Sequence, residues 1–218
     1  MNQSLHPALA EGAKPYTETG HRPLLYLLAK GYASVRAEEL ADLRTLVKRS
    51  YAGKLTNAVF KHVDDQSVVA LEALRQAGAY PPPRDSAWGN WGVVASPCLP
   101  GRSLMADCIQ RFQSEGAWAV SPHIIPHCSL HSLAGLVSLA LDCHGINLGI
   151  GGMPGDHRQV LLVAPALLCN GHLEGIWVIL SGADHVNGKV RAVAFAVSQV
   201  PTTSSTPIAW SDDIFSLD

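Results

Sequence analysis

The stretch SLAGLVSLALDCHGINLGIGG, residues 132–152, places a helix pattern directly before a strand pattern. Residues 130–143 are rich in Leu, Ala and Val and predict a helix. Residues 146–151 are a short apolar run between glycines, which predicts a buried strand. A helix followed at once by a buried strand is typical of a layered α/β fold.

The same alternation continues on both sides of this stretch. Strands are predicted at residues 23–29, 91–96, 175–181 and 190–198, and helices at 34–48, 65–77, 103–114 and 157–170. Ser34 is the candidate cap of the first helix, and Pro165 is expected to kink or split the last one. The final two strands have no helix between them, which predicts an antiparallel pair. We therefore expect a mixed sheet with helices on both faces.

The composition is that of a globular protein. The 218 residues are 47% hydrophobic and 16% charged, which supports a sizeable core, and the formal net charge of −2 does not favour nucleic acid as a partner. No apolar run reaches membrane-spanning length, and residues 1–22 form a polar leader without a signal-peptide pattern. We expect one domain over residues 23–200, a surface tail over 201–218, and a cytoplasmic protein whose five cysteines are reduced.

Histidines and a cysteine gather in the segment HIIPHCSLH. His123, His127, Cys128 and His131 carry the imidazole and thiolate groups that zinc prefers. The spacing of His127 and His131 would place both on one helix face, but Pro126 favours a helix that starts near His127, and the Glu of an HExxH motif is missing. We expect no metal and no cofactor. A zinc-dependent hydrolase built on these residues is kept as an alternative.

The opening stretch resembles the middle of the β-ketoacyl synthases of the thiolase-like superfamily. In that family a helix with small residues leads into Gly-Pro-(Ser/Asn)-Leu-Thr-Val, and here Gly145 with Asn147 and Leu148 matches these anchors. Gly171 and the run IWVILSG at 176–182 match the turn and strand that follow. The resemblance extends over about residues 23–200 and implies one thiolase-like half, a layered mixed sheet with helices on both faces.

The resemblance also indicates which residue stands in place of the family's nucleophilic cysteine. That position lies nine residues after Gly145 and seventeen before Gly171, and both anchors select Pro154. Proline has no nucleophilic atom and no backbone N–H to stabilise an oxyanion. The family's second half, with its two catalytic histidines, has no counterpart in this sequence. The chain therefore resembles a truncated synthase half that is not an enzyme by itself.

Synthases of this superfamily dimerise through the strand before the nucleophile and the helix after it, and acyl chains run along that interface. The resemblance implies an interface and acyl tunnel at Ile146, Gly149, Gly151, Gly152, Met153, Pro154, His157, Val160 and Leu161. The glycines would let a partner backbone or an acyl tail approach closely.

Degenerate synthase subunits called chain-length factors lack the cysteine and pair with an active ketosynthase. We therefore expect a non-catalytic, chain-length-factor-like partner of a ketosynthase in bacterial type II polyketide or fatty-acid biosynthesis, with polyenes among the candidate products. The expected assembly is a heterodimer, and acyl carrier protein is a further candidate partner. A homodimeric acyl-binding module on the same degenerate scaffold is the other alternative.

Overall fold

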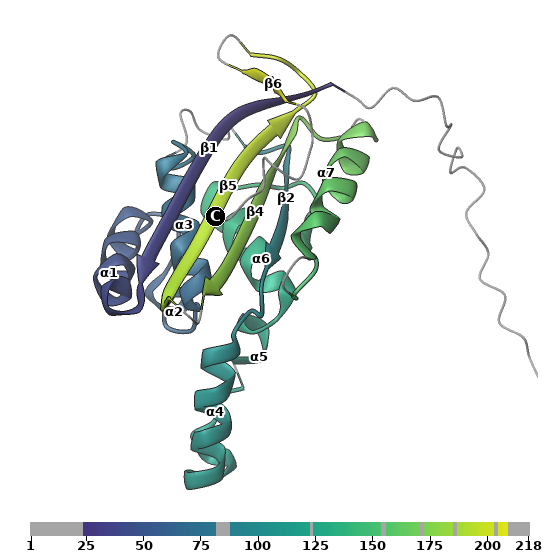
Figure 1. Cartoon of the computed structure of the whole chain (residues 1–218). Coiled ribbons are helices and arrows are strands. Elements are labelled where there is room, and N and C mark those ends of the chain that lie inside the picture. The colour runs from purple at the N-terminus through teal and green to yellow at the C-terminus, as the bar shows by residue number, and fades with distance from the viewer. Residues whose placement is uncertain are drawn as a thin grey trace, which may run out of the picture.

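The computed structural model describes residues 24–81, 88–122, 124–153, 156–170, 172–184, 187–202 and 205–208. Within them, six strands form one sheet in the order β3-β2-β4-β5-β1-β6 (Figure 1). The strands are β1 (Leu25–Arg36), β2 (Trp91–Pro97), β3 (Asn147–Gly149), β4 (Gly175–Asp184), β5 (Lys189–Ser198) and β6 (Thr206–Ile208).

Seven α-helices lie within the described residues. They are α1 (Leu40–Ser50), α2 (Asn57–Phe60), α3 (Asp65–Gln76), α4 (Arg102–Glu115), α5 (Ile124–His127), α6 (Leu130–Leu141) and α7 (Val160–Cys169). Short 3-10 helices adjoin some of them: η1 (Ala37–Glu39) precedes α1, η2 (Ala117–Ala119) follows α4, and η3 (Asp156–Gln159) precedes α7. None of the described helices is both long and apolar enough to cross a membrane.

The sheet is mixed, as expected. β2 pairs in parallel with β3 and with β4, whereas β4 with β5, β5 with β1 and β1 with β6 are antiparallel. The antiparallel pair of β4 and β5 confirms the prediction made from the missing helix between them.

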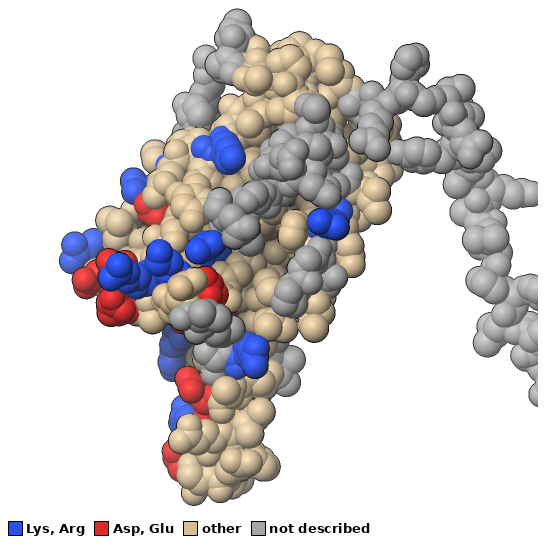
Figure 2. Space-filling model, in the orientation of Figure 1, with Lys and Arg blue, Asp and Glu red and all other residues tan. Residues whose placement is uncertain are grey.

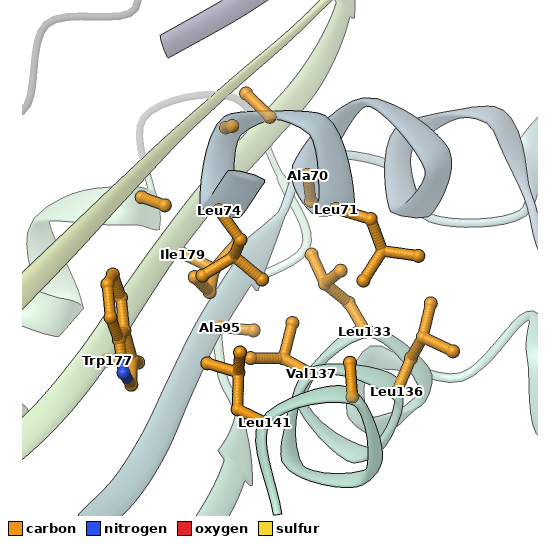
Figure 3. Packing of buried hydrophobic residues seen from close by; sticks show 14 of the residues in the cluster. Ala70, Leu71, Leu74, Ala95, Leu133, Leu136, Val137, Leu141, Trp177 and Ile179 are labelled. Carbon is orange, nitrogen blue, oxygen red and sulfur yellow. The ribbon is translucent and has the colours of Figure 1, made fainter. Parts of the chain in front are cut away.

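Helices cover both faces of the sheet, which confirms the predicted layers. Side chains of α1, α3 and α6 form the larger core cluster with one face of the sheet. In Figure 3, Leu71 and Leu74 of α3 meet Val137 and Leu141 of α6 next to Ile179 of β4. On the opposite face, α7 packs on a second, smaller cluster.

The boundaries of α3 follow from its sequence. Asp64 caps the helix, because its carboxylate accepts a hydrogen bond from the Ser67 N–H at 2.9 Å. Gly78, with φ of +71°, lies just beyond its end. Gly31 of β1 allows this helix to approach the sheet, because a Cβ on Gly31 would overlap the backbone carbonyl of Ala73.

Two boundaries predicted in the N-terminal half are wrong. β1 continues to Arg36, so Ser34 pairs with Arg191 in the sheet and does not cap a helix. The helical segment starts instead at η1, where the Arg36 N–H donates to the Glu39 carboxylate at 3.1 Å. The strand extends through polar residues because β5, far away in the sequence, pairs along its whole length.

Three further elements differ from the sequence prediction. β3 is limited to residues 147–149, because its pairing with β2 ends there. The segment 157–170 is split into η3 and α7, and Pro165 lies inside α7. Within the expected surface tail, β6 pairs with Leu25, Tyr26 and Leu27 of β1 through Ile208, Pro207 and Thr206.

Candidate functional site

β3 is an edge strand of the sheet formed by the described residues. Within the described residues, β2 is the one strand that pairs with it. The Val93 N–H donates to Ile146 O at 2.7 Å, and the Ile150 N–H donates to Ala95 O at 2.9 Å. Because backbone groups alternate along a strand, the N–H groups of Asn147 and Gly149 point away from β2. This edge can therefore accept a strand from another chain.

The glycines around β3 are explained by packing within this chain. A Cβ on Gly149 would overlap the carbonyl of Leu130, at the start of α6. A Cβ on Gly152 would lie 2.9 Å from the Leu130 side chain, and the φ of Gly152 is +121°. The close packing of α6 on β3 thus requires glycine at both positions, whatever lies across the open edge.

The other residues of the predicted interface lie in different environments. Ile146 is 43% exposed and Met153 is 61% exposed, and they flank the edge strand. His157 in η3 is half-buried. Val160 is fully buried against the sheet, so it belongs to the core and does not reach a partner surface. Pro154 and the side chain of Leu161 lie outside the described residues.

An open pocket with a volume of about 370 Å³ lies beside the end of β3. It is formed by the loop after β2, the start of α6 and the loop after β3, and its lining residues are Leu99, Pro100, Arg102, Cys128, Leu130, Gly151, Gly152 and Met153. Burial, the Asp64 carboxylate and the nearby Cys108 raise the pKa of Cys128, so the thiol in this pocket stays protonated near neutral pH. The lining is mainly apolar and suits an alkyl chain.

A buried polar network holds the walls of this pocket in place. The Gln66 side-chain amide donates to Cys98 O at 2.6 Å and accepts from the Ser181 hydroxyl at 3.0 Å. The Asp64 carboxylate also accepts from the Gly101 N–H at 3.2 Å. The Leu99 N–H then donates to Gly152 O at 2.7 Å, which ties the loop after β2 to the loop after β3. The pocket is therefore fixed by the N-terminus of α3 and by β4.

Sequence reasoning missed the apolar surface of α4. Figure 1 shows α4 projecting from the body of the protein, and none of its described residues is buried. Met105, Ile109 and Phe112 are 39%, 53% and 55% exposed, and Trp118 just beyond the helix is fully exposed. The spacing of 105, 109 and 112 on one helix face was visible in the sequence, but its exposure was not. A helix of this length gains little stability without packing, so the exposed apolar stripe of α4 is a candidate contact surface.

The pocket lies between the β3 edge and the start of α4. Arg102, the first residue of α4, lines the pocket together with Met153, which follows β3. We refer to the edge of β3, the pocket and the exposed α4 residues as the partner-binding face.

The histidine segment does not assemble as one helix. His127 ends α5, and His131 lies in α6, so these two residues do not share a helix face as their spacing suggested. The His127 ring stacks on His62, with 5.5 Å between ring centroids. His123 lies outside the described residues, and within those described no three His, Cys, Asp or Glu side chains are grouped to hold a metal ion. The described residues therefore give the zinc hydrolase no ligand cluster.

Comparison with known proteins defines the class of fold. No family model matches this chain, and no curated protein matches it by sequence. Solved structures of ketosynthases and chain-length factors match it over most of its length. The chain has the thiolase-like fold of ketosynthases and chain-length factors.

The similarity can be quantified for individual structures. "The ishigamide ketosynthase/chain length factor" matches with a TM-score of 0.60 and 16% identity, over 84% of this chain and 64% of that chain. The ketosynthase ApeO in complex with its chain length factor ApeC, from Xenorhabdus doucetiae, matches with a TM-score of 0.60 and 9% identity, over 83% and 59%.

A third structure is AntDE:AntF, a type II polyketide synthase acyl-carrier protein in complex with its ketosynthase bound to the hexaketide. It matches with a TM-score of 0.56 and 13% identity, over 82% of this chain and 63% of that chain. The chain thus spans less than two thirds of the length of the structures it matches.

Proposed function

We propose that this chain is a non-catalytic, chain-length-factor-like partner of a ketosynthase in bacterial type II polyketide or fatty-acid biosynthesis, with polyenes among its products. The observation that carries the proposal is the sequence directly after the open-edge strand β3, where Pro154 occupies the position of the family's nucleophile. The strand offers a site for pairing with a partner, and proline at the nucleophile position supplies no nucleophilic atom for condensation.

Two of the described cysteines, Cys128 and Cys143, are poor replacements for the missing nucleophile. Cys128 lines the pocket, but its raised pKa keeps it a thiol. Burial and the Asp142 carboxylate raise the pKa of Cys143 to about 12, and this residue lies in the core. Because the thiolate is the nucleophilic form, neither cysteine is suited to acyl transfer at neutral pH. The ketosynthase partner supplies the condensation.

The partner-binding face suggests how the subunit contributes. A strand of the ketosynthase pairs with the outer side of β3, and the α4 stripe packs on the same partner. The pocket then lies at the heterodimer interface, where its apolar wall, including Leu130 and Met153, limits the space for a growing acyl chain. Two of the similar structures are ketosynthase and chain-length-factor pairs, which supports this arrangement.

Other partners follow from the same proposal. Acyl carrier protein delivers acyl groups to the ketosynthase, and one similar structure is a complex of that kind. We place the assembly in the cytoplasm, where the cysteines, which form no disulfide among the described residues, stay reduced. A homodimer formed through the same β3 edge, with an acyl chain bound, is the competing assignment.

Coexpression with type II ketosynthases tests the proposal. We expect a stable heterodimer by native mass spectrometry and no condensation by this subunit alone. Asn147→Pro removes an outward-facing N–H of β3 and is expected to abolish the heterodimer, whereas Asn147→Ala keeps this N–H and is expected to retain it. Ile109→Glu with Phe112→Glu should weaken binding, and Gln110→Glu, on the same helix, should not.

Three outcomes would contradict the proposal. The first is a chain that ignores every ketosynthase tested. The second is equal binding by the Asn147→Pro and Asn147→Ala variants, which would remove the β3 edge from the interface. The third is a homodimer that is lost in Asn147→Pro, which would favour the acyl-binding module.

A further inference from the structure

A second cavity, with a volume of about 190 Å³, lies between the N-terminus of α3 and helix α6. Its lining residues come from α2, the start of α3, the end of α5 and α6, and they are Val59, Val63, Asp64, Ser67, His127, Ser132, Gly135, Leu136 and Leu139. It shares none of these residues with the pocket beside β3. The two cavities are therefore separate sites.

The walls of this second cavity are mainly apolar. Val63 and Leu136 are each 6% exposed, whereas Leu139, 63% exposed, lies where the cavity meets the solvent. His127 contributes an aromatic ring, which is stacked on His62 with 5.5 Å between ring centroids. Such walls favour an apolar guest with a flat ring.

A buried carboxylate also lines the cavity. Asp64 is 9% exposed, and its oxygens accept hydrogen bonds from the Ser67 N–H at 2.9 Å and the Gly101 N–H at 3.2 Å. A carboxylate has about four lone-pair sites, so these two bonds leave room for a further donor. Because an ionised carboxylate can only accept, a guest that bonds to Asp64 must bring an O–H or N–H group.

The volume limits the size of the guest. An apolar cavity of about 150 Å³ holds one benzene molecule, so this cavity suits a single six-membered ring with a small substituent. A long acyl chain does not fit. A carboxylic acid would bring a second negative charge close to Asp64 in mainly apolar surroundings, which is unfavourable.

Charge on the surface does not replace this local selection. In Figure 2, Lys and Arg side chains toward α1 lie beside Asp and Glu side chains, and Arg36 with Glu38 is one such pair. Neighbouring charges of opposite sign produce little net field at a distance. The lining of the cavity therefore selects its guest.

We propose that this cavity binds a phenol, a small aromatic molecule with one hydroxyl group. The ring lies among Val63, Leu136 and His127, and the hydroxyl donates to the Asp64 carboxylate. The site goes beyond the proposed function, because it needs neither a ketosynthase nor an acyl chain.

An NMR titration of the full chain with phenol tests the proposal. We expect saturable binding, with the amide signals of Ser67 and Gly101 among those that shift most, because both amides donate to Asp64. Toluene has the same ring without the hydroxyl and should bind at least about tenfold more weakly. Benzoate should not compete with phenol. The absence of saturable phenol binding, or equal affinity for phenol and either of the other two compounds, would overturn the proposal.

Two variants locate the site on the chain. Ser67→Leu places a larger side chain at a buried position of the cavity wall and should abolish phenol binding, whereas Ser114→Leu, exposed on α4, should not. Asp64→Asn still caps α3, because the amide oxygen accepts from Ser67, but it should reduce phenol affinity to that of toluene. Asp107→Asn, exposed on α4, is its control.

Circular dichroism establishes that each variant is folded. If Ser67→Leu does not fold, the Asp64→Asn variant and the three compounds on the native chain still decide the outcome. An unchanged phenol affinity in either folded cavity variant would refute the site. Because no ketosynthase is present in these measurements, such a failure would leave the proposed function intact.

Discussion

The two faces of the sheet are covered in different ways. On one face, α1, α3 and α6 form a continuous core, and residues 68–71 of α3 have no exposed surface. On the other face, within the described residues, α7 covers the smaller cluster and leaves its own outer side exposed. Among the described residues, one layer is therefore covered on both sides, and the other leaves an apolar outer face exposed.

Polar groups sharpen this contrast. The covered face holds buried polar side chains with partners, such as Tyr51, whose hydroxyl donates to Leu71 O at 2.9 Å, and the Gln66 amide beneath the pocket. The packing surface of α7 carries no such group. Directional bonds fix the position of the covered face, whereas α7 depends on shape and apolar area alone.

The largest effect is expected where β1 and α3 touch. Gly31→Ala should destabilise the protein by more than about 5 kcal/mol or prevent folding, because the new methyl group would overlap the backbone of Ala73. Gly53→Ala is the control, since the nearest heavy atom to its Cβ would be 3.9 Å away. Urea unfolding of both variants measures the difference. Equal stability of the two would show that the covered face is loosely packed.

A smaller effect is expected from trimming one leucine on each face. Leu74→Ala, in the covered core, should cost about 2–5 kcal/mol of unfolding free energy. Leu162→Ala, 76% exposed in the native chain, should cost less than about 1 kcal/mol when measured at low protein concentration. Comparable losses at both sites would mean that the two faces are equally packed in the monomer.

The smallest effect concerns pH and the covered face. Burial alone would raise the pKa of Glu72, but the Arg75 and Gln76 side chains donate to its carboxylate and hold its pKa below 4.5. A lowered carboxylate pKa stabilises the fold above pH 4.5, and this contribution is lost as the pH falls through the folded-state pKa.

The Glu72→Gln variant should therefore be less stable than the native chain at pH 7, by about 1 kcal/mol of unfolding free energy. This gap between the two unfolding free energies should close toward pH 3. The control is Glu115→Gln, because the Arg111–Glu115 pair is mostly exposed and 3.9 Å apart, so this substitution is expected to change the unfolding free energy little. Urea unfolding at several pH values provides the measurement. A gap for Glu72→Gln that does not change with pH would mean that the hydrogen bonds do not hold the carboxylate.

Much of the fold could be predicted from local patterns. α3, α6 and the strands β2, β4 and β5 follow their apolar spacing and end signals. The extension of β1 to Arg36 could not be predicted, because it depends on pairing with β5, more than 150 positions away in the sequence. The local pattern also predicted that Ser34 caps a helix, but Ser34 lies in β1 and pairs in the sheet instead.

The candidate site was predicted less completely than the fold. The sequence led to the edge strand and to Pro154, but it could not separate Val160, buried in the core, from the neighbouring Leu162 on the surface. The spacing of Met105, Ile109 and Phe112 was present, yet whether a helix face is covered depends on the whole fold. The spacing in the histidine segment suggested one shared helix face, but the segment is divided between two helices, α5 and α6.

The two edges of the sheet differ in what they allow. β6, three residues long with Pro207 at its centre, pairs with Leu25–Leu27 of β1, and among the described residues no strand pairs with the outer side of residues 28–36. β3, at the other edge, has donors on its outer side. β1 therefore offers a second strip of backbone, longer than β3, so a partner strand at β3 would not by itself use up the pairing capacity of this sheet.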